Sequence, residues 1–111
     1  MNYVPDRGDA IWLDFDPQAG REQAGRRPAL VLSPALYNRR AGLAVVCPIT
    51  SRVKSYPFEV SLPAGLPISG VVLSDHVRSV DWQVRRATFI AQLPAEVFTY
   101  VMEKLQLLLK P

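Results

Sequence analysis

The sequence predicts a mainly β domain of the α+β class: a small β-barrel with short helices and one amphipathic helix at its C-terminal end. Several short apolar stretches with period-two alternation are separated by turn residues, which is typical of a small barrel or sandwich. Ten prolines, nearly all at the borders of these stretches, fit many short strands better than a helix bundle. A length of 111 residues suits a single domain over residues 1–111.

The first strand is expected at 8–16, where Ile11, Leu13 and Phe15 alternate with more polar positions. Residues 17–28 are rich in Gly, Gln, Arg and Glu and predict a long loop, a kind of segment that often carries function. One helical turn ending at Gly42 follows the second strand. The remaining strands are expected at 28–34, 43–50, 56–62 and 85–93, and residues 70–82 form two strands or one bent strand with a turn around 74–76.

The C-terminal segment has the periodicity of an amphipathic helix. Val97, Val101, Leu105 and Leu108 follow one another at helical spacing, and Pro94 suits the first turn. Further apolar residues widen this stripe, so the helix either packs deeply or meets another subunit; they are Phe98, Met102 and Leu109.

Composition and charge limit the possible partners. Hydrophobic residues make up 49% and mean hydropathy is +0.06, ordinary values for a soluble globular domain, and no apolar stretch could span a bilayer. No secretory signal is visible at the N-terminus, and a lone Cys47 in an apolar strand indicates a buried, inert thiol and a cytoplasmic protein. Net charge is +3, and residues 21–40 carry five arginines against one glutamate. This concentration of arginine is compatible with a polyanionic partner or an ordinary solvated surface.

Residues 21–28, REQAGRRP, place one carboxylate among three arginines on the expected loop. Glu22 can accept a proton, and a neighbouring guanidinium can hold a phosphate oxygen with two parallel bonds. Those two groups, with hydroxyls such as Thr50 and Ser51 to bind phosphoryl oxygens, meet the needs of RNA cleavage without a metal. The alternative is a surface ion pair between Glu22 and Arg26 or Arg27, of small energetic value.

Metal and triad chemistry have little support in the sequence. One histidine and one cysteine, without ligand-spacing motifs, are too few for a dedicated transition-metal site, and no cofactor fingerprint is present. A hydrolase triad depends on His76, which more often serves as a hydrogen-bonded structural residue or a ligand contact in such a segment.

The ordered motifs GDAIWLDFDP, REQAGRRPALVLSP, CPITSRVKSYPFEV and VVLSDHVRSVDW, with the closing apolar helix, resemble the MazF/PemK family of toxin endoribonucleases over essentially the whole chain. The resemblance implies an SH3-like barrel of the CcdB/PemK type, a homodimer, and metal-independent cleavage of single-stranded RNA. It further implies 2′,3′-cyclic phosphate and 5′-hydroxyl products and no cofactor. The implied partner is a cognate, MazE-like antitoxin whose flexible acidic tail occupies the RNA groove.

By the same resemblance, the catalytic arginine falls on Arg27 and the catalytic threonine on Thr50, while Glu22 is either the general base or a loop-organising residue. Trp12 and Phe15 are candidates for stacking on unpaired bases, although Trp12 is more often a core residue in this pattern. Arg26 lies where relatives vary and His76 where many carry Gln, so a relative's cleavage sequence does not transfer. The expected RNA contacts are Gln23, Arg26, Ser51, Arg52, Lys54, Tyr56 and His76.

Two other functions use the same barrel. Non-enzymatic, gyrase-binding toxins of the CcdB type depend on an aromatic C-terminal tail, whereas this chain ends in LLLKP. A scaffold module that has lost catalysis is at odds with the retained motif of Glu22, Arg27 and Thr50.

Overall fold

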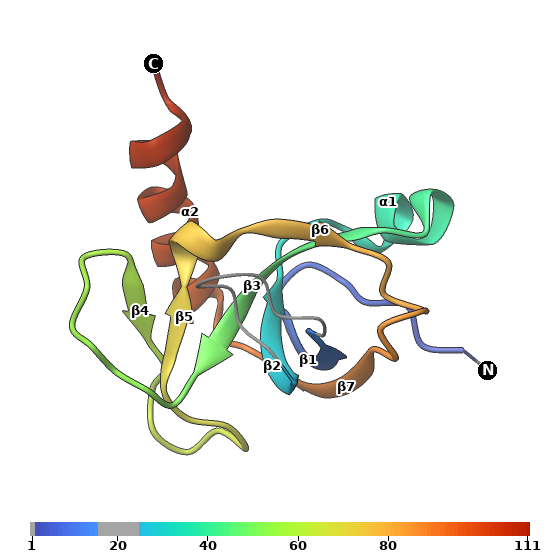
Figure 1. Ribbon diagram of the computed structural model, residues 1–111, viewed down its shortest axis with the longest axis horizontal. Helices are drawn as coiled ribbons and strands as arrows, with labels where there is room; N and C mark the ends of the chain where they lie inside the picture. Colours follow the sequence, from blue (N-terminus) through green and yellow to red (C-terminus); the bar gives the residue numbers. More distant parts are fainter. Residues whose placement is uncertain (1, 16–24) are drawn as a thin grey trace.

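The computed structural model describes residues 2–15 and 25–111 and shows a curved antiparallel sheet with a helix at either side (Figure 1). The elements are β1 (Asp9–Asp14), β2 (Arg26–Val31), α1 (Ala35–Ala41), β3 (Ala44–Thr50), β4 (Glu59–Ser61), β5 (Val71–Leu73), the 3-10 helix η1 (Ser74–His76), β6 (Arg78–Val80), β7 (Thr88–Gln92) and α2 (Ala95–Leu109).

The strands lie in the order β4-β5-β3-β2-β1-β7, with β6 pairing to β3. Strand β3 connects the two halves of the sheet, because its first part pairs with β6 and its last two residues pair with β5. The antiparallel sheet with its two α-helices confirms the α+β class. Within the described ranges no pairing joins β4 to β7, so the strands do not close into the predicted barrel.

Both faces of the central strands are buried without such closure. Alternation sends Ala10, Leu30 and Cys47 to one face, where Val97 and Val101 of α2 cover them. The opposite face packs a second cluster under the N-terminal segment and the turn after β6, formed by Ile11, Leu13, Phe15, Ala29, Val31, Ala44, Val46, Val80 and Trp82. The helix and the turn bury the apolar surface that a closing pair of strands would otherwise cover.

The observed elements refine the predicted ones. Helix α1 ends at Gly42 as predicted, although it has seven residues rather than one turn, and Gly42 adopts the left-handed region with φ 72°. The two-strand reading of residues 70–82 is confirmed, with η1 at the turn. Strand β4 begins only at Glu59, because the Glu59 N–H donates to the Tyr56 carbonyl and closes a turn there.

Helix α2 packs through Val97, Val101 and Leu105, as its periodicity predicted. Leu108 was expected on the same buried face but is 49% exposed, because the last turns of α2 extend beyond the strands (Figure 1). No helix in the described ranges combines the length and the apolar character needed to cross a bilayer.

Candidate RNA-cleavage site

The register of β2 and β3, extended beyond their last paired residues, places Arg27 opposite Thr50. The last pairs between β2 and β3 run from Val31–Val46 to Ala29–Pro48. Continuing this antiparallel register by two residues places Arg27 across from Thr50, with both side chains on one face of the sheet. Arg27 is exposed and Thr50 is only 7% exposed. The extended register therefore assigns facing positions to two residues that are 23 positions apart in the sequence.

The Thr50 side chain is oriented by the backbone that follows it. Its Oγ1 accepts a hydrogen bond from the Arg52 N–H at 3.1 Å. A hydroxyl that accepts through one lone pair can still donate its own proton, here to an oxygen of a bound phosphate. Beside Arg27, which offers a planar fork of N–H donors, this arrangement can bind two phosphoryl oxygens at once.

The backbone of Thr50 is closely approached by Gly70, the residue directly before β5. A Cβ built on Gly70 would lie 2.1 Å from the Thr50 carbonyl oxygen, and Gly70 has φ +116°. The next residue, Val71, pairs with Thr50 in the β3–β5 ladder. The position of Thr50 therefore depends on a close approach that only glycine permits.

Arg26 points away from Arg27, since successive side chains of a strand alternate between faces. Its guanidinium donates to Asp14 Oδ1 at 3.0 Å, to the Arg86 carbonyl at 2.9 Å and to Thr88 Oγ1 at 2.9 Å. Arg86 also binds Asp14, so β1, β2 and the start of β7 are fastened together. The guanidinium of Arg26 therefore has three intramolecular acceptors.

Asp14 and Arg26, which are joined by an ion pair, lie at the strand ends on either side of the segment that carries Glu22 and Gln23. Both of these predicted site residues lie outside the described residues. At the ends of that segment, the Phe15 N–H donates to the Gly25 carbonyl at 2.8 Å. The described chain therefore enters and leaves the 16–24 segment through a hydrogen-bonded pair at one end of β1 and β2.

The other predicted contacts fall into two groups. Directly after Thr50, an exposed basic segment carries the Lys54 ammonium 5.9 Å from the centre of the Tyr56 ring; its predicted RNA contacts are Ser51, Arg52, Lys54 and Tyr56. His76 lies apart from them in η1, which packs on α2 and lies beside Cys47. Cys47 is three residues before Thr50, about 10 Å along a strand. Because η1 leads directly into β6, whose Arg78 pairs with Val46, His76 lies beside the middle of β3 and not at its end.

Two aromatic predictions are wrong. Phe15 is fully buried, where the Arg78 guanidinium lies 5.7 Å from its ring centre, and so it offers no face for stacking on a base. Trp12, interpreted mainly as a core residue, is 38% exposed and lies on the strand face opposite Leu13. Cys47 is fully buried as predicted, and burial raises the pKa of its thiol to about 12.

Comparison with known proteins identifies the family of this chain. A family model for PemK-like, MazF-like toxins of type II toxin-antitoxin systems matches residues 6–109. The chain belongs to this family. It is 47% identical over 107 residues to the endoribonuclease toxin MazF of Escherichia coli K12, with 96% of each chain covered.

Solved structures of the family have the same fold. The crystal structure of MazF from Deinococcus radiodurans superposes with a TM-score of 0.96 at 61% identity, covering 99% of this chain and 100% of that one. A MazE-MazF complex from the same organism matches with a TM-score of 0.87 at 56% identity, with 97% of both chains covered.

Four residues that shape the surroundings of the site were not predicted from the sequence: Asp14, Glu59, Gly70 and Arg86. Gly70 stands directly before an apolar strand, a signal of close backbone approach that was available in the sequence. Arg86 gave no such signal, because it adopts φ 55°, a region that favours glycine or asparagine over arginine. The pairing of Asp14 with Arg86 joins residues 72 positions apart, which only the fold reveals.

Proposed function

We propose that this chain is the endoribonuclease toxin of a type II toxin–antitoxin system and cuts single-stranded RNA without a metal ion. The observation that carries the proposal is the position of Arg27 opposite Thr50, beside an exposed basic segment. The family match and the printed names of the relatives support the reaction class.

In the proposed reaction, the 2′-hydroxyl next to the scissile phosphate loses its proton and its oxygen attacks phosphorus. The bond to the 5′-oxygen breaks, and that oxygen leaves protonated, giving 2′,3′-cyclic phosphate and 5′-hydroxyl ends. Arg27 holds the phosphoryl oxygens as their negative charge grows, and Thr50 donates a further hydrogen bond. Glu22 is the proposed proton acceptor, or else it organises the loop that carries it. Arg27 is also the proposed proton donor to the leaving 5′-oxygen, and a purely electrostatic role for its guanidinium is the alternative.

Proposed RNA contacts follow the backbone from this pair. Ser51, Arg52, Lys54 and Tyr56 are exposed directly after Thr50, so they can bind phosphates and stack on one unpaired base. Gln23, from the sequence alone, and Arg26 and His76, at their positions in this chain, are weaker candidates.

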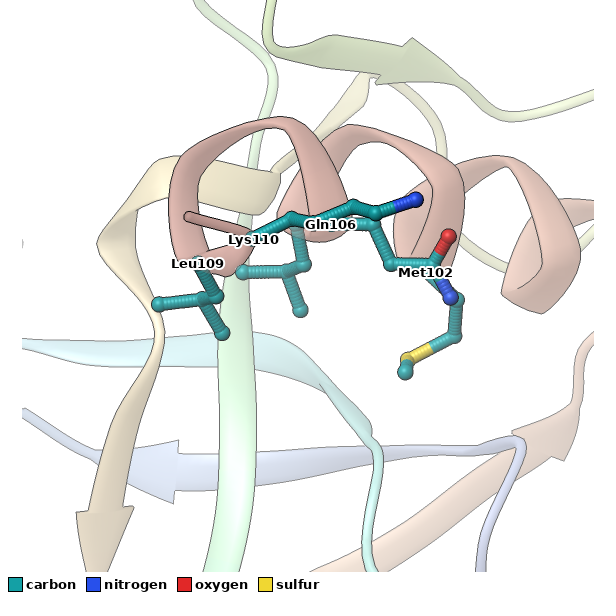
Figure 2. A pocket seen from close by; sticks show the side chains of 5 residues that line it. Met102, Gln106, Leu109 and Lys110 are labelled. Carbon is teal, nitrogen blue, oxygen red and sulfur yellow. The ribbon is translucent and has the colours of Figure 1, made fainter.

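The proposed partners are a second copy of the chain and an antitoxin with a flexible acidic tail. The solved MazE-MazF complex shows that a relative at 56% identity assembles with an antitoxin. For the homodimer, the C-terminal turns of α2 expose Leu107, Leu108 and Leu109. Met102 and Leu109 project from the same side of α2 into an open groove (Figure 2). We further propose one domain over residues 1–111 acting in the cytoplasm.

The test is incubation of the purified protein with a long unstructured RNA and with duplex RNA, in the presence of EDTA. We expect cleavage of the single strand at a recurring sequence, duplex RNA left largely intact, and cyclic-phosphate ends on mapping. Metal-dependent cutting would overturn the mechanism. No cutting of any single-stranded RNA, together with inhibition of gyrase, would favour the non-enzymatic alternative.

A further inference from the structure

We propose that Glu59 is a positioning residue that holds the basic segment 51–56 in the shape that binds RNA. The tests of this inference that measure RNA binding or cleavage rest on the proposed function. Glu59 lies outside the predicted contacts, and it is the first residue of β4, paired with Leu73 of β5. Its half-buried side chain turns back toward the segment that leads from Thr50.

The carboxylate of Glu59 accepts hydrogen bonds from two successive backbone amides. The Ser55 N–H donates to Oε1 at 2.9 Å, and the Lys54 N–H lies 3.1 Å from Oε2 and 3.3 Å from Oε1. The Glu59 N–H donates to the Tyr56 carbonyl at 3.1 Å and closes the same turn. One residue therefore fixes the backbone of Lys54, Ser55 and Tyr56.

The backbone at Ser55 needs such a restraint. Ser55 has φ 61°, in the left-handed region that a residue with a Cβ adopts at a cost. A non-glycine residue stays there when surrounding bonds determine its conformation, and such residues gather at functional sites. At the other end of the segment, Arg52 is tied to Thr50 Oγ1. The basic segment is thus held at both ends, by Thr50 and by Glu59.

The charge of Glu59 makes its role testable by the sign of an effect. A carboxylate bound to the backbone of the basic segment at Lys54 lowers the positive potential that attracts RNA. If Glu59 acted only through its charge, removing that charge would tighten RNA binding. If Glu59 positions the segment, its removal weakens RNA binding although the protein becomes more positive.

The experiment compares Glu59→Gln with Glu103→Gln, a matched change of charge at an exposed position on α2. The probe is a single-stranded 2′-O-methyl oligonucleotide, which lacks the attacking hydroxyl, at one fixed salt concentration. We expect Glu59→Gln to raise Kd about fivefold. This is the loss of affinity that corresponds to one stacked base at the lower end of the usual range of stacking energies. Glu103→Gln should leave Kd unchanged or slightly lower it. Binding by Glu59→Gln that equals or exceeds wild type overturns the proposal.

A second variant changes the segment without touching the carboxylate. Valine tolerates positive φ poorly, so Ser55→Val should also raise Kd, with no change in net charge. In cleavage assays both variants should raise KM more than they lower kcat, because the segment binds RNA while Arg27 and Thr50 stay in place. A fall confined to kcat would contradict the positioning role.

Hydrogen exchange tests the positioning role independently of RNA. The Lys54 and Ser55 amides should exchange faster in Glu59→Gln than in wild type, while core β3 amides stay protected. Unchanged exchange at Lys54 and Ser55 would overturn the proposal even if the protein cuts RNA. A wild-type protein that neither binds nor cuts RNA would instead remove the proposed function and leave this structural role standing.

Discussion

The Nε of Arg86 lies 2.7 Å from Oδ2 of Asp14, and this ion pair joins the turn before β7 to the end of β1. Arg26 reaches the other oxygen of the same carboxylate at 3.0 Å. The backbone adds two bonds, since the Asp14 N–H donates to the Arg85 carbonyl and the Arg85 side chain donates to the Asp14 carbonyl. Asp14 therefore joins the strand end that leads into the 16–24 segment to the turn at 85–86.

The ion pairs of Asp14 predict a specific dependence of stability on pH. Hydrogen bonds from Arg86, then from Arg26, lower the pKa of Asp14 to about 2. Because the pKa is lower in the folded than in the unfolded state, about 3.9, the stabilisation is complete above that value. It is lost as pH falls through about 2.

We therefore expect Asp14→Asn to lower Tm at neutral pH and to make Tm less sensitive to acid. Thermal unfolding followed by circular dichroism between about pH 7 and pH 2 measures both effects. Glu103→Gln, at an exposed helix position, controls for the loss of one carboxylate. An Asp14→Asn protein whose Tm falls as steeply as that of wild type below about pH 4 would contradict this role.

The two neighbouring arginines predict a clear division of effects. Arg27→Ala should lower kcat about 10²- to 10³-fold, the usual effect of removing one donor that stabilises transition-state charge. Arg27→Lys should recover only part of this loss, because an ammonium keeps the charge but not the fork of donors. Single-turnover cleavage of a short RNA measures these losses.

Arg26→Ala serves as the matched comparison. It removes an equal charge one residue away, but its guanidinium binds Asp14, the Arg86 carbonyl and Thr88. We expect a lower Tm and a smaller loss of cleavage than in Arg27→Ala. Equal loss of cleavage in the two variants, with Tm unchanged in both, would contradict the separate roles assigned to Arg26 and Arg27.

Much of the fold could be predicted because local patterns agree with it. The alternation at Ile11 and Leu13, Gly42 after α1, and the spacing of Val97, Val101 and Leu105 each correspond to observed burial or conformation. Barrel closure could not be predicted in this way, since it depends on which distant strands pair. Local patterns do not show that a helix and a turn cover the two faces instead.

The types of residue in the site could be predicted from the sequence, but the residues that hold them in place could not. Arg27 and Thr50 carry the motif, but only the β2–β3 register, extended by two residues, places them opposite each other. Arg26 resembles Arg27 in the sequence, and its separate role follows from Asp14 and Arg86, which are distant along the chain. Supports of this kind are long-range contacts, which a pattern of neighbouring residues does not encode.

The hydroxyl of Thr50 can be tested without changing the shape of its side chain. Thr50→Val is nearly isosteric but can neither donate to a phosphoryl oxygen nor accept from the Arg52 N–H, so we expect kcat to fall about 10- to 10²-fold. Thr50→Ser keeps the hydroxyl and should retain most of the activity. Cleavage rates at saturating RNA measure the difference. If Thr50→Val cut RNA as fast as Thr50→Ser, the hydroxyl would have no part in the reaction.

Substitution of Gly70 should produce the most severe steric clash near the site. A methyl group there would lie 2.1 Å from the carbonyl oxygen and 2.8 Å from the carbonyl carbon of Thr50, so the end of β3 must move in Gly70→Ala. We expect a loss of stability of about 1–3 kcal/mol, from strain at positive φ and from the clash. Cleavage should fall by more than the loss of folded protein explains, because Thr50 itself is displaced.

Gly65→Ala is the control for this substitution. Gly65 also has positive φ, +92°, but a Cβ there would meet nothing within 4 Å. The two variants therefore share the backbone strain and differ in the contact with Thr50. We expect Gly65→Ala to lose stability without a matching loss of kcat in the folded protein. If both variants lost stability and cleavage equally, positive φ alone would account for Gly70, and its closeness to Thr50 would not matter for the reaction.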